Sequence, residues 1–491
     1  MERGSDRFSH MTTTPTTARP EPDAQADLAD VTPMDRAASG PLMLLIGSGI
    51  LWLLVAGVLG LVDSIQLHSP HFLASYAWLT HGRVNAMAET AFVYGWLANA
   101  GLAIGLWVLG RLGGSLLRAL NWTFVGALFW NLAVTSGLIG IAAGEMTSFS
   151  LLQSSPYVQP LMTISYGAIA ISGVLAWMGR RSAVTYAAQW YAVAALFLFP
   201  WFSSVAQLVL FWSPLRGVAQ SVAVAWHAQA IWSLWLAPLA LSVAYYLVPK
   251  LSGRVLPLYD FARLGFWVLI GAGSWTGSRN LVGGPVPAWL VTLSITAGVL
   301  LMTHVVILVL NLRVIHGVRG TAAGFVKLGL VSYLLCAVLD LVTAFRSIAE
   351  GTQFTLFGAG LWQLATYGST SMIFFGAIYY MVPRLTGSRW ASMGLTIGHR
   401  ILAPLGVVGL VLALSVAGWT QGSDLLNAKT PWGDVFDHMK LPLLIVSAAQ
   451  IALLSANLLL FVNFLQTIRR AAVHEVTSRS PIALGTEVSV S

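Results

Sequence analysis

The chain has 491 residues, of which 57% are hydrophobic and only 9% are charged, and its formal net charge is +8. Because a soluble domain carries about 25% charged residues, this chain cannot cover a water-exposed surface, and we expect its surface to face membrane lipid. The composition excludes a soluble enzyme and a nucleic-acid-binding protein. The single cysteine, Cys336, also excludes a disulfide-stabilised scaffold and a cysteine-based metal site.

Residues 1–40 differ from the rest of the chain. They hold four arginines and seven acidic residues, are rich in Thr, Pro, Ala and Asp, and contain few large hydrophobic residues. This composition predicts a disordered tail. The first hydrophobic run begins near Pro41 and, at about 22 residues, is long enough to remain in a bilayer, so a cleaved secretory signal is not predicted.

From residue 41 to residue 468, hydrophobic runs alternate with short polar segments. A helix needs about 20 apolar residues to cross a bilayer. The sequence therefore predicts an all-α, polytopic membrane domain with twelve transmembrane helices, followed by a tail over residues 469–491. The predicted spans are residues 42–62, 86–109, 120–143, 158–178, 187–212, 222–248, 261–277, 286–311, 323–345, 356–382, 400–419 and 441–466; the seventh is short and rich in Gly and Ser.

The connections between these spans differ in their content of Arg and Lys. Alternate connections from Arg111 to Arg470 hold fifteen basic residues, whereas those on the opposite side hold six. Basic residues are enriched in cytoplasmic loops, so this asymmetry predicts that both termini are cytoplasmic.

Two segments, residues 244–253 and 378–387, repeat one pattern. In each, a Tyr-Tyr pair is followed by Val-Pro, a cation and, three residues later, Gly. Taken alone, the pattern is typical of a helix end at a membrane interface, where Tyr is enriched and Pro stops the helix.

Together with other blocks, these segments resemble subunit I of the haem-copper oxidases, most nearly the catalytic subunit of the cbb-type (C-family) cytochrome c oxidase. The resemblance implies a haem-copper oxidase subunit I-like bundle in the bacterial inner membrane. A c-type cytochrome or another respiratory-complex subunit would then be a partner. The blocks that carry the resemblance are Gly82-Arg83 with Tyr94-Gly95-Trp96, residues 234–250, residues 257–259 with 284–290, and residues 375–387.

The resemblance also implies six histidine ligands, which hold a low-spin haem, a high-spin haem and a copper ion through neutral imidazole nitrogens. Neither Ala nor Leu can ligate iron, and the fixed charge of Arg would repel a copper ion. We therefore expect no haem, copper or other metal, and no catalytic residue. Counted from the matched blocks, the six ligand positions fall on Ala88, Gln229, Arg279, Asn280, Leu361 and Gln363, and the cross-linked tyrosine of the family falls on Gly273.

Charged residues inside a membrane need a partner or water. Glu89 lies beside Ala88, and Arg279 stands at a copper-ligand position. We hypothesise that a polar network refills the space of the missing cofactors. Asp340, in the ninth span, is interpreted as a structural residue. The proposed members of the network are Glu89, Gln229, Arg279, Asn280 and Gln363.

The ten histidines are interpreted mainly as structural or solvated residues. His227 and His304 lie within predicted spans and are expected to be packed and hydrogen-bonded, with residual haem ligation by this pair left open. His438 is expected to pair with Asp437. The remaining histidines are assigned to tails, connections and an outer loop, where a metal site is disfavoured: His10, His68, His71, His81, His316, His399 and His474.

Three functions remain open. The first is a non-catalytic homologue of subunit I that serves as an accessory or structural subunit of a respiratory electron-transfer membrane complex. The second is an active haem-copper cytochrome c oxidase subunit I, with haem binding, oxygen reduction and proton pumping, whose ligands lie elsewhere. The third is a proton or solute channel on the same scaffold. Haem and copper analysis of the purified protein separates the first two.

Overall fold

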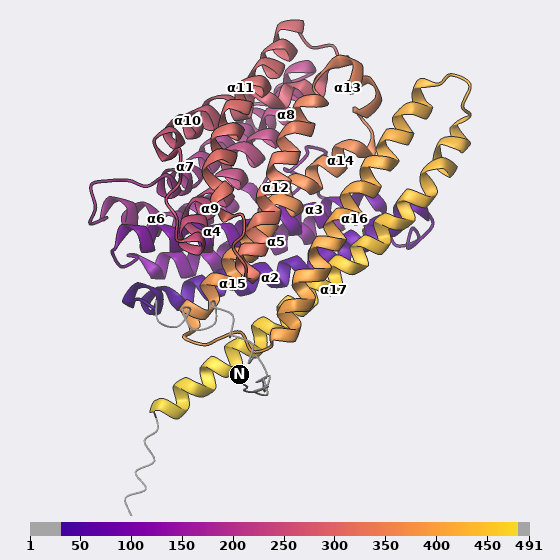
Figure 1. Ribbon diagram of the computed structural model, residues 1–491. Coiled ribbons are helices and arrows are strands. Elements are labelled where there is room, and N and C mark those ends of the chain that lie inside the picture. Colours follow the sequence, from indigo (N-terminus) through magenta and orange to yellow (C-terminus); the bar gives the residue numbers. More distant parts are fainter. Residues whose placement is uncertain (1–30, 480–491) are drawn as a thin grey trace, which may run out of the picture.

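The computed structural model describes residues 31–479 as a bundle of long helices (Figure 1). Within these residues the β structure is confined to one isolated bridge between Met146 and Ser154, so the all-α prediction is confirmed. The helices are α2 (Pro33–His68), α3 (His81–Thr90), α4 (Ala98–Gly113), α5 (Leu120–Ala143), α6 (Gln159–Met178), α7 (Ala187–Gln207), α8 (Val218–Ala230), α9 (Ala237–Ser252), α10 (Ala262–Ala272), α11 (Ala288–Leu312), α12 (Thr321–Val342), α13 (Arg346–Thr352), α14 (Leu356–Gln363), α15 (Met372–Thr386), α16 (Met393–Leu426) and α17 (Trp432–Arg479).

In the described part of the chain, ten helical stretches are long and apolar enough to cross a membrane. The exact count of twelve is therefore not confirmed, although helix is present at all twelve predicted positions. The seventh stretch, α10 with its continuation as the 3-10 helix η6 (Gly273–Leu281), is not apolar enough, because η6 is rich in Gly, Ser and Thr and holds Arg279 and Asn280. The tenth is helical from α14 to α15, but its middle segment, Leu364–Ser371, is rich in Thr and Ser.

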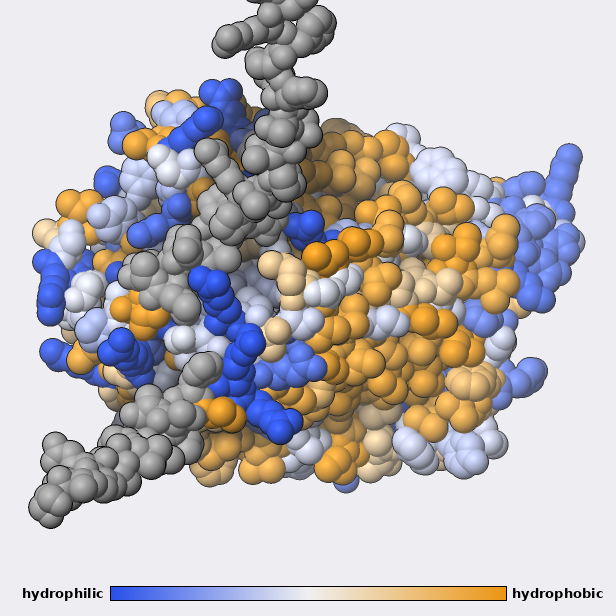
Figure 2. Space-filling view, turned by 60° about the horizontal axis from the view of Figure 1, so that its bottom comes forward, coloured by the Kyte–Doolittle hydropathy of each residue, from blue (hydrophilic) through white to orange (hydrophobic). Residues whose placement is uncertain are grey.

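The surface of the bundle fits a membrane environment. Figure 2 shows a broad hydrophobic face, with hydrophilic residues gathered on either side of it. Large apolar side chains are exposed on outer helices, such as Leu128 and Ile139 of α5 and Leu405 and Leu412 of α16. Only lipid can solvate so much apolar surface, because soluble proteins rarely expose large contiguous apolar patches. The chain is therefore an integral membrane protein.

The predicted tails, residues 1–40 and 469–491, include residues that the structure places in helices. Residues 33–40 belong to α2, because Thr32 and Asp35 form a reciprocal capping box at its start. Asp35 is fully buried; it accepts a hydrogen bond from Trp107 Nε1 at 2.8 Å and pairs with Arg111 at 2.9 Å. Residues 469–479 continue α17. The rest of both tails, residues 1–30 and 480–491, lies outside the described residues.

Three helical lines cross the centre of the bundle, and a π-helical segment divides each of them. The segment η2 (Ala91–Leu97) joins α3 to α4, η4 (Ile231–Leu236) joins α8 to α9, and η8 (Leu364–Ser371) joins α14 to α15. A π-helical turn holds an extra residue, so it changes the direction in which the side chains on either side of it point.

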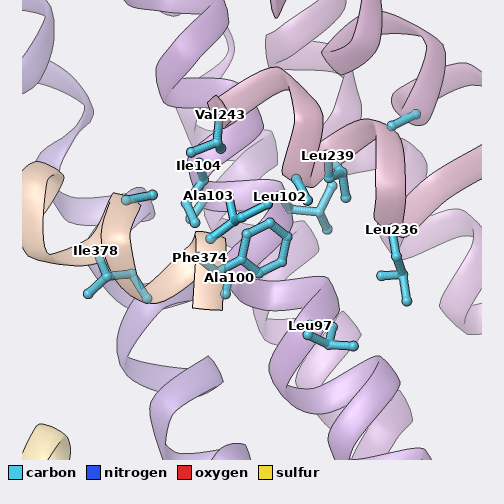
Figure 3. Packing of buried hydrophobic residues seen from close by; sticks show 14 of the residues in the cluster. Leu97, Ala100, Leu102, Ala103, Ile104, Leu236, Leu239, Val243, Phe374 and Ile378 are labelled. Carbon is cyan, nitrogen blue, oxygen red and sulfur yellow. The ribbon is translucent and has the colours of Figure 1, made fainter. Parts of the chain in front are cut away.

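The C-terminal halves of these lines, α4, α9 and α15, pack closely against each other (Figure 3). Gly101 of α4 lies where Leu239 of α9 and Phe374 of α15 meet, and both of these side chains are buried. A Cβ at Gly101 would lie 2.8 Å from the nearest atom of Leu239 and 3.0 Å from Phe374. The small residue is therefore required for the three helices to approach.

The repeated segments 244–253 and 378–387 form the ends of α9 and α15. In each helix, Gly253 or Gly387 ends the helix in a left-handed conformation, with φ of 63° and 62°. One part of the interface interpretation was wrong, because Pro249 and Pro383 lie inside the helices rather than stopping them. The four tyrosines of the two pairs are buried inside the bundle: Tyr245, Tyr246, Tyr379 and Tyr380.

Candidate functional site

A cavity of about 680 Å³ lies between the N-terminal halves of the central helices and the surrounding helices α2, α12, α13, α16 and α17. A ligand pocket is typically about 300–1,000 Å³, so the space can hold a molecule. All six positions that the resemblance assigns to cofactor ligands line this cavity, as does Glu89: Ala88, Glu89, Gln229, Arg279, Asn280, Leu361 and Gln363.

The π-helical segments adjoin these positions. Ala88 lies three residues before η2, Gln229 lies two residues before η4, and Gln363 directly precedes η8. Such segments occur frequently at functional sites because they redirect side chains without ending the helix. Three separate helices thus change their geometry beside the same cavity.

Arg279 is held in the 3-10 helix η6 with 8% of its side chain exposed. Its Nη1 donates to the carbonyl oxygen of Thr276 at 3.0 Å, and its Nη2 donates to Asp340 Oδ1. Asp340 comes from α12, so the ion pair connects η6 to that helix across the cavity wall. Asp340 therefore lines the cavity and fixes Arg279 in its wall.

Glu89 lies on α3 and accepts a hydrogen bond from Gln153 Nε2. Nearby on the cavity wall, Asp63 pairs with His81 at 3.0 Å and accepts from Asn85 Nδ2 at 3.1 Å. Because His81 and Asn85 are exposed, they lie at the mouth of the cavity. In the described part of the chain, the Glu89 carboxylate accepts from a single amide donor, that of Gln153.

The five residues predicted to form a polar network share the cavity, but within residues 31–479 no hydrogen bond joins any two of them directly. Glu89 bonds to Gln153, Arg279 bonds to Asp340, and the carbonyl oxygen of Asn280 accepts from Gln353 Nε2. Sequence reasoning missed all three partners. Asp340 could have been found, because a charged residue inside a predicted span needs a partner. The two glutamines, Gln153 and Gln353, lie outside the predicted spans, so the sequence did not indicate them.

The side chains of the cavity do not fit the cofactors that the resemblance implies. A bis-imidazole haem and a three-histidine copper ion need several converging nitrogens. Among the described residues that line the cavity, His81 is the one histidine, and it is held at the mouth by Asp63. The described part of the chain also contains no cluster of three or more His, Cys, Asp or Glu residues able to hold a metal ion.

The position of the family's tyrosine, Gly273, is closed as well. A Cβ there would lie 2.9 Å from Ser233 Cβ, and the next nearest atom is the hydroxyl of the same serine. A tyrosine ring therefore cannot be accommodated without moving the 3-10 helix away from the central helix that carries Ser233.

The two histidines within the spans differ. His304 is buried, and its ring nitrogens lie 2.9 Å from the carbonyl oxygen of Gly265 and 3.1 Å from the hydroxyl of Tyr333, as expected for a packed and hydrogen-bonded residue. His227 is also buried against Phe202, but neither of its ring nitrogens has a hydrogen-bond partner among the described residues. The expected hydrogen bonds of His227 are therefore absent.

Two other interpretations of histidines were wrong. His399 was assigned to a solvated connection, but α16 begins at Met393, so His399 is buried and lies 3.0 Å from the hydroxyl of Tyr379. His438 pairs with Asp424 of α16 at 2.9 Å rather than with its neighbour Asp437, because the α16–α17 hairpin brings these ends together. His10 and the side chain of His474 lie outside the described part of the structure.

The comparisons with known proteins point to one family. Residues 41–452 match the family described as "Cytochrome C and Quinol oxidase polypeptide I". A "Cytochrome c oxidase subunit 1 homolog" of Agrobacterium tumefaciens (strain T37) is 25% identical over 397 residues, which cover 76% of this chain and 72% of the relative. The "Cbb3-type cytochrome c oxidase subunit CcoN1" of Stutzerimonas stutzeri is 23% identical over 391 residues, covering 76% of this chain and 81% of the relative.

A solved structure shares the fold. A chain in the "Cryo-EM structure of a heme-copper terminal oxidase dimer" superimposes with a TM-score of 0.64 at 14% sequence identity, covering 88% of this chain and 84% of the other. Since the family match extends over most of the 491 residues, the chain belongs to the cytochrome c and quinol oxidase polypeptide I family.

Proposed function

We propose that this protein is a non-catalytic member of its family, an accessory or structural subunit of a respiratory electron-transfer complex in a bacterial inner membrane, with both termini in the cytoplasm. One observation carries the proposal. The six positions assigned to the cofactor ligands line a single cavity, and none of them is a histidine. The site has kept its location in the fold but lacks the donor atoms for haem and copper.

The ion pair between Arg279 and Asp340 supports the proposal. A guanidinium remains charged at any physiological pH, and here its carboxylate partner fixes it in the wall. A copper ion beside it would meet a permanent positive charge. The pair therefore favours a chain whose function no longer uses a metal at this position.

The proposal is tested by purifying the chain and recording its reduced pyridine-haemochrome spectrum together with its copper content. We expect neither haem nor copper in stoichiometric amount. The cbb3-type subunit of Stutzerimonas stutzeri, produced and purified in the same way, is the control for cofactor supply. Stoichiometric haem and copper in this chain would contradict the proposal and favour an active oxidase.

The partner is tested separately. An affinity-tagged chain, isolated from its native membranes in a mild detergent, is expected to bring down a protein whose band on a denaturing gel stains for covalent haem, as a c-type cytochrome does. A chain that reproducibly purifies alone would contradict its role as a subunit.

A second candidate, a proton or solute channel, is favoured by the way two cavities meet. A smaller cavity of about 40 Å³ shares Arg279, Cys336 and Asp340 with the larger one and reaches His304 and Tyr333. Purified chain in liposomes loaded with a pH-sensitive dye would show a proton flux faster than that of empty liposomes if the chain is a channel, and D340N would change that flux.

A further inference from the structure

We propose that the large cavity binds an amphipathic organic cation, that is, a protonated amine or quaternary ammonium attached to an apolar body. This inference rests on the proposed function, because a haem would occupy the same space. It assigns a ligand class to a site that has lost the donors for metals.

The first argument is the charge of the wall. Three carboxylates line the cavity, Asp63, Glu89 and Asp340. Arg279 neutralises Asp340, and Asp63 is paired with His81, whereas the one partner of Glu89 among residues 31–479 is the neutral amide of Gln153. Charges interact strongly in the low-dielectric interior of a membrane protein. A ligand with one positive charge would neutralise the carboxylate of Glu89.

The second argument is the aromatic part of the wall. Phe92 lies on the cavity three residues after Glu89 and stacks on Tyr367, with ring centroids 5.3 Å apart. Further aromatic rings come from α14 and from the start of η4. Aromatic faces attract organic cations and also bury apolar groups. The additional rings that line the cavity include Trp232, Phe357 and Trp362.

The third argument is the set of amides that face this space. The side chains of Gln229, Gln363 and Gln450 line the cavity, and within residues 31–479 no protein group hydrogen-bonds to any of them. The three amides are half-buried, so their donors and acceptors are available to water or to a ligand in the cavity. Apolar walls with a few converging polar groups are typical of small-molecule sites, and the volume of about 680 Å³ suits one such ligand.

The ligand would reach the site through the mouth beside His81 and Asn85, which are exposed. Asn280 and Phe354 are exposed on the same cavity, at its α13 side. An amphipathic cation would enter there from water or from the interface and place its charge near Glu89, with its apolar body against the rings.

The test is equilibrium dialysis of purified chain in lipid nanodiscs against labelled benzyltrimethylammonium, with empty nanodiscs subtracted. We expect saturable binding of one cation per chain, competed by other quaternary ammonium ions. Benzylsulfonate, of similar size and opposite charge, is expected not to compete. Absence of saturable binding, or equal competition by benzylsulfonate, would overturn the proposal.

Two variants locate the binding. E89Q removes the unbalanced charge and is expected to weaken binding about tenfold or more, while Q363K adds a cation to the wall and is expected to abolish it. E145Q changes an exposed glutamate outside the cavity and is the matched control, with binding unchanged. Size-exclusion profile and thermal midpoint show that each variant is folded; unchanged binding in folded E89Q and Q363K would refute the assignment.

The same preparations separate the two proposals. Stoichiometric haem in the pyridine-haemochrome spectrum contradicts the proposed function and this inference together. A preparation free of haem that does not bind the cation contradicts this inference alone.

Discussion

In the C-terminal halves of the three central helices, α4, α9 and α15, apolar side chains fill the space between the helices. The N-terminal halves, α3, α8 and α14, border a cavity of about 680 Å³ with charged and amide side chains in its wall. Each pair of halves belongs to one helical line that is divided at a π-helical segment. The difference shows that the bundle is held together by its packed half, so the other half has room for chemistry or a ligand.

The largest expected effect comes from the packed half. F374A removes a fully buried ring between α4 and α9 and should lower the free energy of unfolding by about 3–5 kcal/mol, because a cavity replaces the ring. F92A, in the wall of the existing cavity, is the matched variant and should cost about 1 kcal/mol, since its ring already borders open space. Unfolding in mixed micelles, followed by tryptophan fluorescence, measures both. Equal losses would mean that the two halves do not differ in packing.

The ion pair should give the next effect. D340L leaves the Arg279 guanidinium without its carboxylate and should destabilise the chain by about 3 kcal/mol, because an unpaired charge remains in a mostly buried site. The double variant R279M/D340L has no charge at this position and should recover most of that loss. A complete double-mutant cycle by the same unfolding measurement tests this; additive losses would show that the pair is not coupled.

Gly-to-Ala substitutions compare how tightly the C-terminal and N-terminal halves of the central helices are packed, because each adds one methyl group. G101A should cost about 1–3 kcal/mol, because the new Cβ would press on Leu239 and Phe374. Gly358 of α14 has no atom within 4 Å of an added Cβ, so G358A should stabilise the helix by up to about 1 kcal/mol. Differential scanning fluorimetry would show thermal midpoints moving in opposite directions, and a shift of the same sign in both variants would contradict the comparison.

The smallest effect on stability is expected for E89Q. The side chain stays on the cavity and can still accept a hydrogen bond from Gln153, so the free energy of unfolding should change by less than about 1 kcal/mol. Binding of the organic cation should nevertheless be weakened. A large loss of stability in this variant would assign Glu89 to the scaffold rather than to a ligand site.

Much of the architecture could be predicted because it follows from local composition. Hydrophobic runs of bilayer length placed helix at every predicted span, and the motif blocks identified the family before any contact was known. The errors arose where tertiary contacts decide. The sequence around Asp35 predicts a solvated acidic residue in a polar tail. In the structure Asp35 is buried and contacts Trp107 and Arg111. His399 reads as a loop residue, yet an extended α16 places it beside Tyr379.

The candidate site was predictable in part for the same reason. Counting from the matched blocks selected residues that line one cavity, because spacing along a helix is a local property. The partners of Glu89 and Arg279 were not predictable, since Gln153 and Asp340 lie 64 and 61 residues away in the chain.

The sequence alone determined that the chain is a polytopic helical membrane protein of the oxidase family and that no histidine stands at the six positions counted from the matched blocks. Both conclusions depend on residue identity and local spacing. Only the tertiary structure decided that those positions surround one cavity, that Arg279 is neutralised by Asp340, and that Glu89 accepts from the amide of Gln153. These facts depend on how distant helices pack, because hydrogen bonds and ion pairs form only where packing brings their atoms within about 3 Å.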